Sequence, residues 1–79
     1  MTRTYTILAV SYRPTRLGPI PLNPPEHREY HATTLQEALT MAEREDAGIA
    51  DYLYGILPED YAQARDEDIE FNEADGLLL

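Results

Sequence analysis

The hydrophobic pattern begins with an alternation of period two. Residues 4–12 place two sets of largely apolar side chains on opposite faces, Tyr5, Ile7 and Ala9 on one and Leu8, Val10 and Tyr12 on the other. This alternation, rich in β-branched and aromatic residues, predicts a β-strand. Because both faces are apolar, we expect the strand to lie inside its sheet rather than at an edge. Residues 27–32 predict a second, antiparallel strand.

From Thr34 onward the apolar residues follow helical spacing. Thr34 and Glu37 stand three apart, as in a capping box, where the hydroxyl and the carboxylate accept hydrogen bonds from amides at the helix start. The apolar positions that follow are three and four apart: Leu35, Ala38, Leu39 and Ala42, with Met41 at the margin. The pattern predicts a helix over 34–46 that buries one face.

Residues 48–57 fit two patterns. Tyr52, Tyr54 and Ile56 alternate as in a strand, whereas Ile49, Leu53 and Ile56 are also spaced as a helical stripe. The aromatic and β-branched content favours the strand, bounded by a glycine at 48 and a proline at 58. The alternative makes 48–57 helical and leaves a hairpin packed on two or three helices.

Residues 58–79 are rich in acidic side chains and predict only short elements. Pro58 suits the first position of a short helix, whose positive start Glu59 and Asp60 complement. Residues 68–72 are compatible with a last strand. The three leucines at 77–79 fit a frayed end or a tail that packs on the core or on a partner, so the order of the acidic segment 66–79 stays open.

Five of the six prolines fall within residues 13–26: Pro14, Pro19, Pro21, Pro24 and Pro25. Proline fixes φ and removes a backbone donor, so this segment is expected to be a stiff loop without regular strand. The expected fold is therefore a single α+β domain over 1–79. It is a small antiparallel sheet of two to four strands, covered on one face by the 34–46 helix, with a short helix after Pro58.

Charge divides the chain into two halves. Residues 1–39 hold four Arg against three Glu, whereas residues 40–79 hold two Arg against twelve acidic residues, for a net charge of −9. The core of so short a chain, which has no Cys, is thin, so docking to a partner or a homodimer is plausible from size alone. No apolar run approaches the roughly 20 residues of a membrane span, and the default location is the cytoplasm.

Two stretches of the sequence partly match metal-binding motifs. His27 and His31 flank Glu29, but a zinc-binding HExxH helix needs the Glu directly after the first His. The acidic run 66–77 fits a calcium loop at its first positions but has Phe71 where glycine is required and Leu77 where a bidentate Glu is required.

Covalent and acid–base chemistry have equally little support. There is no Cys, and the only Ser, Ser11, lies in the first strand without a neighbouring base. The carboxylates show no sign of a pair in contrasting environments. We predict no catalytic residue, cofactor or metal.

What remains is an acidic and aromatic surface. Six carboxylates fall within residues 66–75, and such an array is either a solvated face or a mimic of nucleic-acid phosphates that enters a basic groove. Aromatic residues are favoured anchors in interfaces. The predicted partner-binding residues are Glu59, Asp60, Asp66, Glu67, Asp68, Glu70, Tyr52, Tyr54 and Tyr61. The alternative is an antitoxin-like interaction module that binds a protein through the apolar stretch 52–57 and the C-terminal leucines.

In overall build the chain resembles the small acidic anti-CRISPR proteins encoded by phages. The shared features are the short length, the strong negative charge, the absence of Cys, the strand pair with one capped helix and the Tyr-rich remainder. The resemblance implies a non-enzymatic inhibitor that binds a Cas subunit in the host cytoplasm. It would block the groove that receives DNA or prevent nuclease recruitment, without binding nucleic acid itself. It implies no role for any single residue.

Overall fold

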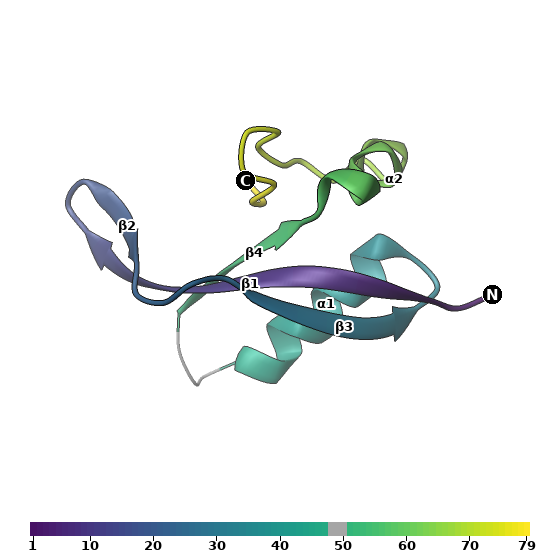
Figure 1. The fold of residues 1–79 in the computed structure, drawn as a ribbon, viewed down its shortest axis with the longest axis horizontal. Helices are drawn as coiled ribbons and strands as arrows, with labels where there is room; N and C mark the ends of the chain where they lie inside the picture. Colours follow the sequence, from purple (N-terminus) through teal and green to yellow (C-terminus); the bar gives the residue numbers. More distant parts are fainter. Residues whose placement is uncertain (48–50) are drawn as a thin grey trace.

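A computed structural model describes residues 1–47 and 51–79. In chain order the elements are β1 (Arg3–Thr15), β2 (Gly18–Pro21), β3 (Glu26–Ala32), α1 (Leu35–Asp46), β4 (Tyr52–Ile56), the 3-10 turn η1 (Pro58–Asp60) and α2 (Tyr61–Asp66) (Figure 1). Four antiparallel strands and two helices confirm the predicted α+β fold, including the short helix after Pro58. Gly48 and Ile49, on which the 48–57 prediction partly rests, lie outside the described residues.

The first strand is central, as predicted. Ile7 pairs with Arg28 of β3 on one side and with Ile56 of β4 on the other. Of the two sets of side chains on β1, the first is buried, and the second is buried at Val10 and half-buried at Leu8 and Tyr12. The rest of β1 continues beyond the body of the molecule, where it pairs with β2 (Figure 1).

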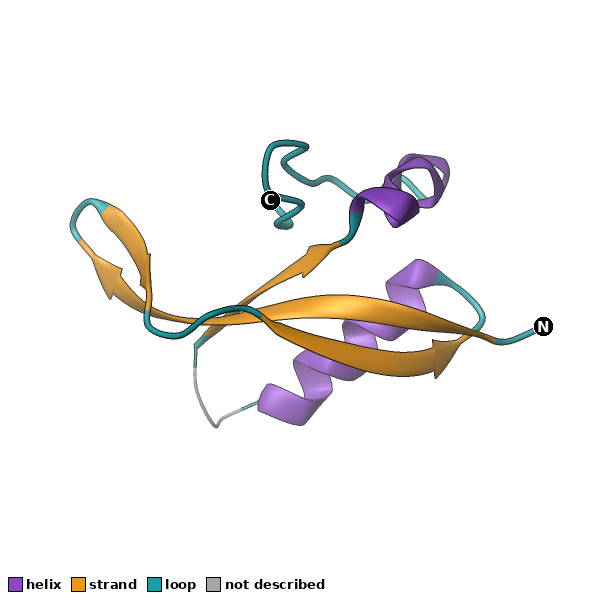
Figure 2. Cartoon of the chain, in the orientation of Figure 1, coloured by secondary structure: helices purple, strands orange, loops and turns teal. Residues whose placement is uncertain are grey.

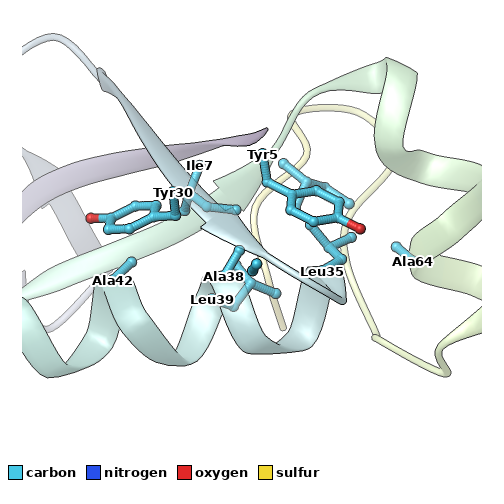
Figure 3. Packing of buried hydrophobic residues seen from close by; sticks show 10 residues of the cluster. Tyr5, Ile7, Tyr30, Leu35, Ala38, Leu39, Ala42 and Ala64 are labelled. Atoms are coloured by element: carbon cyan, nitrogen blue, oxygen red, sulfur yellow. The ribbon is translucent and has the colours of Figure 1, made fainter. Parts of the chain in front are cut away.

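Helix α1 covers one face of the sheet (Figure 2). Its buried residues are those of the predicted stripe, Leu35, Ala38, Leu39 and Ala42. They pack against Tyr5, Ile7 and Tyr30 of the sheet, and Figure 3 shows Tyr5 lying beside Leu35 and Ala64. Burying a side chain as large as leucine or isoleucine contributes about 1.5–3 kcal/mol to the free energy of folding, so the contact between α1 and the sheet is a main source of stability.

The start of α1 is capped differently from the prediction. Thr34 does accept a hydrogen bond from the amide of Glu37, at 3.1 Å. The Glu37 carboxylate, however, accepts from the Thr33 hydroxyl instead of returning to Thr34. The amides of Leu35 and Gln36 donate hydrogen bonds to the carboxylate of Glu67, which is more than 30 positions away in the sequence. The capping box is therefore only half formed.

The proline-rich segment is not the irregular loop that we expected. Pro14 pairs with Pro19 and Tyr12 pairs with Pro21 in an antiparallel hairpin of β1 and β2. Hydrogen-bonded and non-bonded pairs alternate in such a ladder. Proline has no backbone amide to donate, and the pairs that contain proline occupy the positions of the ladder that exchange no hydrogen bonds. The pair of Arg13 and Ile20 between them occupies a hydrogen-bonded position. The prolines thus fit a strand pairing whose register the sequence pattern did not reveal.

The C-terminal segment returns to the outer edge of β4. Ile56 donates its amide to the carbonyl of Gly76 at 2.9 Å, and Leu78 donates to the carbonyl of Tyr54 at 2.8 Å. Of the predicted strand 68–72, only an isolated bridge between Phe71 and Leu78 forms. Gly76 has φ +77°, and a Cβ there would lie 2.3 Å from the Ile56 carbonyl oxygen, so only glycine fits this contact.

Candidate protein-binding surface

Asp60 is buried and takes part in an ion pair within the fold, so it is not available on the surface. Its side chain is only 3% exposed, and Arg3 donates to its Oδ1 at 2.6 Å. The Arg3 guanidinium also lies over the Tyr5 ring, 4.2 Å from its centroid. The ion pair fastens the start of β1 to η1. Sequence reasoning missed Arg3 because the two partners are 57 positions apart.

Glu67 is also engaged within the chain. It accepts hydrogen bonds at 2.9 Å from the amides of Leu35 and Gln36, and one at 2.7 Å from the side chain of Gln63. Burial by itself would raise the pKa of Glu67, but these three donors outweigh it and hold the pKa below its ordinary value. Glu67 is the anionic cap that stabilises the start of α1.

Four of the six predicted carboxylates are exposed: Glu59, Asp66, Asp68 and Glu70. Among the described residues none of the four side chains has a hydrogen-bond or ion-pair partner. Glu59 lies in η1, Asp66 ends α2, and Asp68 and Glu70 follow in the turn beyond it. We call these four residues the acidic end; it lies at the α2 end of the molecule (Figure 1).

Two members of the acidic end lie where α2 ends. Asp66 lies in the last turn of α2, where the negative end of the helix dipole repels a carboxylate. Asp68 adopts φ +59°, in the left-handed region that aspartate enters more readily than most side chains, and there the amides of Asp68 and Ile69 donate to carbonyls at the end of α2. Neither carboxylate gains a bond within the described residues, so the two negative charges, as distinct from the backbone turn, bring no evident benefit to folding.

The three predicted tyrosines contribute mainly to packing. Tyr54 donates its hydroxyl to Asp46 and to the Ala42 carbonyl, and burial together with the Asp46 bond raises its pKa. Tyr52 stacks on Tyr54, with 6.3 Å between ring centroids. Tyr61 packs on Phe71 at 4.6 Å. Tyr52 and Tyr61 are half-buried, so each retains a partial exposed surface.

A second group of acids surrounds Arg28, and we call it the Arg28 cluster. Arg28 donates to Glu26 at 2.9 Å and to Asp46 at 2.8 Å, with Glu45 at 3.8 Å. Burial would lower the pKa of Arg28, but its hydrogen bonds outweigh burial and hold the pKa above its ordinary value. Tyr30 donates its hydroxyl to Glu45. These carboxylates have ion-pair or hydrogen-bond partners within the fold, unlike those of the acidic end.

The apolar surface of the alternative interpretation is largely occupied. Ile56 is buried in the core, and Tyr54 packs against it. Leu77 bridges to Gly55 and Leu78 to Phe71, so both leucines are half-buried within the chain. Leu79 alone of the three is exposed.

The end of the molecule opposite α2 is formed by the hairpin of residues 12–25, which we call the arm (Figure 1). The arm carries Arg13 and Arg16 and no acidic residue. Leu17, Ile20 and Leu22 are exposed on it. The molecule is thus electrically polarised along its longest dimension, which is 41 Å.

One hollow on the surface lies along the arm. It has a volume of about 250 Å³, and its lining contains no carboxylate or histidine: Tyr12, Pro14, Thr15, Gly18, Pro19 and Leu53. Within residues 1–47 and 51–79 no three His, Asp or Glu side chains are placed to hold a metal ion. No helix of the described part is both long and apolar enough to cross a membrane.

Comparison with protein-family models, curated proteins and solved structures gives no match to the chain. Functional inference therefore rests on the surface just described.

Proposed function

We propose that this chain is a non-enzymatic inhibitor that binds the basic groove of a nucleic-acid-binding protein through the acidic end. The candidate partner is the one that the resemblance implies, a multi-subunit RNA-guided surveillance complex in the cytoplasm of the host cell. Inhibition then follows because the groove cannot hold this chain and DNA at the same time.

The observation that carries the proposal is the contrast in how carboxylates are used. Two carboxylates are bonded within the fold. Asp60 links η1 to β1, and Glu67, just after α2, accepts hydrogen bonds from the start of α1. Glu59, Asp66, Asp68 and Glu70 project from that anchored support. They are therefore an array on an ordered scaffold, which loses less conformational entropy on binding than a disordered acidic tail.

The charge of the chain also suits this role. A net charge of −9 on 79 residues repels nucleic acid and attracts proteins that bind it, and such attraction accelerates encounter. In residues 51–79 Arg65 is the only basic residue, and it pairs with Glu73. Little positive charge therefore opposes a basic groove at this end.

Displacement of DNA tests the proposal. Purified surveillance complexes of several subtypes are loaded with a fluorescent target duplex, and the chain is titrated in while anisotropy is recorded. We expect the chain to release the duplex from at least one complex. We also expect a variant with Glu59→Gln, Asp66→Asn, Asp68→Asn and Glu70→Gln to need a concentration at least roughly tenfold higher, since each exposed charge pair is worth about 0.2–1 kcal/mol.

Raising the salt concentration provides the second arm of the test. Exposed charge pairs are screened, with a Debye length of about 8 Å at physiological ionic strength, so binding should weaken as salt increases. Binding that is equally strong at low and high salt, or equally strong for the fourfold variant, contradicts the proposal.

A further inference from the structure

Two strands of the sheet have outer edges that are closed. Along β4, the C-terminal segment supplies hydrogen bonds to Ile56 and Tyr54. Along β2, Pro19 and Pro21 have no amide to offer, which is a common way of blocking an exposed strand edge. Neither edge is suited to pairing with another strand.

The orientation of the β3 backbone follows from these contacts. Ile56 directs its amide away from β1, so its neighbour Gly55 faces β1 at Leu8. Backbone groups alternate sides along an antiparallel strand. Leu8 therefore faces β4, while Ile7 faces β3 at Arg28.

The same alternation directs the backbone of His27, Glu29 and His31 away from β1. Within the described residues no hydrogen bond to these amides or carbonyls is present. The β3 segment 26–32 contains no proline. Unlike the outer edges of β4 and β2, this edge is neither covered by another segment nor blocked by proline, and such an edge is a template for strand addition.

The side chains of this edge are self-complementary. His27, Glu29 and His31 are exposed and lie on the face opposite α1, because Tyr30 between them is buried towards the helix. The order His-x-Glu-x-His reads the same in both directions. An antiparallel copy of the strand can therefore pair so that the Glu of each copy lies opposite a His of the other. This needs a shift of two residues from the register in which Glu29 faces Glu29.

We propose that β3 pairs with β3 of a second copy of this chain, antiparallel and about a two-fold axis at Tyr30. In this register Glu29 lies opposite His31 of the second copy, and the relation holds twice by symmetry. An axis at Glu29 would instead oppose two carboxylates, which is destabilising. An axis at Arg28 would bring Pro25, which lacks an amide, opposite His31 and lose hydrogen bonds.

Pairing two copies extends one continuous sheet and adds backbone hydrogen bonds to a domain whose own core is small. The like charge of the two copies opposes association, since each carries −9. Salt screens that repulsion. Dimerisation should therefore strengthen, or stay unchanged, as salt increases, whereas binding through the acidic end weakens, so the two proposals can fail separately.

Substitution of Glu29 by proline is the sharpest test. At an outward position proline removes the edge amide and leaves the β1–β3 ladder in place. Mass in solution is measured by sedimentation from about 1 µM to about 1 mM, the range of modest affinities. We expect the wild-type chain to move from 9.0 kDa towards twice that mass, and Glu29→Pro to weaken the dimer roughly tenfold or more. Glu29→Ala, which keeps the amide, should weaken it less.

A charge exchange tests the register and does not depend on the proline variant folding. His31→Glu places a carboxylate opposite Glu29 of the second copy, and this happens at both symmetric pairs, so we expect a dimer several-fold weaker. Combining it with Glu29→Lys restores opposite charges at the same pairs and should restore the dimer. Circular dichroism checks that each variant is folded.

The proposal is overturned by a mass of 9.0 kDa at every concentration. It is also overturned by a folded Glu29→Pro variant that dimerises like the wild type, or by a charge exchange that fails to rescue His31→Glu. An edge that binds an extended peptide of another protein while the chain itself stays monomeric contradicts it as well.

Discussion

The Arg28 cluster and the acidic end contain similar numbers of carboxylates but differ in their surroundings. In the Arg28 cluster, Asp46 and its neighbours are paired with a guanidinium and two phenols, and they join β3, α1 and β4. At the acidic end, carboxylates such as Asp68 and Glu70 are exposed and have no partner within the described residues. The same residue type therefore holds the fold together in one region and charges its surface in the other.

This difference shows why net charge alone is a poor guide to a binding site. The acidic half of the sequence contains residues of both kinds, and only the contacts separate them. Stability and binding should consequently respond to different substitutions. The predictions below follow from that division, in order of decreasing effect on stability.

The largest effect is expected at Arg28. Arg28→Met leaves Asp46, whose side chain is 11% exposed, without its counterion, and should lower the free energy of unfolding by about 2–4 kcal/mol. Urea unfolding followed by circular dichroism measures this. The matched control is Arg65→Met, which breaks a pair with Glu73 whose side chains are 55% and 65% exposed; it should cost at most about 1 kcal/mol. Equal losses of unfolding free energy in the two variants would contradict the distinction between carboxylates that hold the fold together and carboxylates that only charge its surface.

The next effect concerns the attachment of the C-terminal segment. Gly76→Ala places a Cβ 2.3 Å from the Ile56 carbonyl oxygen and requires a left-handed residue other than glycine, so we expect a loss of about 2–3 kcal/mol. Gly18→Ala is the control, because its φ is also positive but no atom lies within 4 Å of the added Cβ. Thermal unfolding of both variants compares them, and a smaller loss at Gly76 than at Gly18 would be inconsistent with the close contact.

A smaller, pH-dependent effect is expected at Glu67. Glu67→Ala removes the cap of α1 and should cost about 1–2 kcal/mol at pH 7. Because the folded pKa of Glu67 is lowered, its contribution is fully present above about pH 4.5, the ordinary value, and is lost as the pH falls through the lower folded value. The difference between wild type and variant should therefore shrink in acid. A difference that stays constant down to about pH 2 would rule out an ionised cap.

The smallest effect on stability is expected at the acidic end. Asp68→Asn combined with Glu70→Gln breaks no contact in the described residues, and asparagine tolerates the left-handed conformation of residue 68 well. The free energy of unfolding should change by less than about 0.5 kcal/mol. A loss comparable to that of Glu67→Ala would mean that these carboxylates hold the fold.

The sequence predicted those elements whose pattern is local. The alternation around Ile7 and the spacing from Leu35 to Ala42 record burial directly, so α1 was found with nearly its true bounds and β1 was found over 4–12, short of its end at Thr15. The hairpin was missed because its prolines are compatible with a strand only in one register, which depends on Arg13 facing Ile20.

The candidate site was predicted only in part. Nothing near Asp60 or Glu67 in sequence indicates that their partners are Arg3 and the amides of Leu35 and Gln36, more than 30 positions away. A charge run shows that a surface is acidic, but it cannot show which carboxylates are consumed by distant contacts. That separation required the three-dimensional arrangement.

We propose that the acidic end, rather than overall charge, binds a basic partner. The most direct measurement is the affinity for the surveillance complex of two double variants, Asp68→Asn/Glu70→Gln and Glu43→Gln/Asp51→Asn, which lose the same two residue types and the same charge. We predict that the first weakens binding roughly three- to thirty-fold and the second by less than about twofold. Equal weakening by both variants would contradict the account.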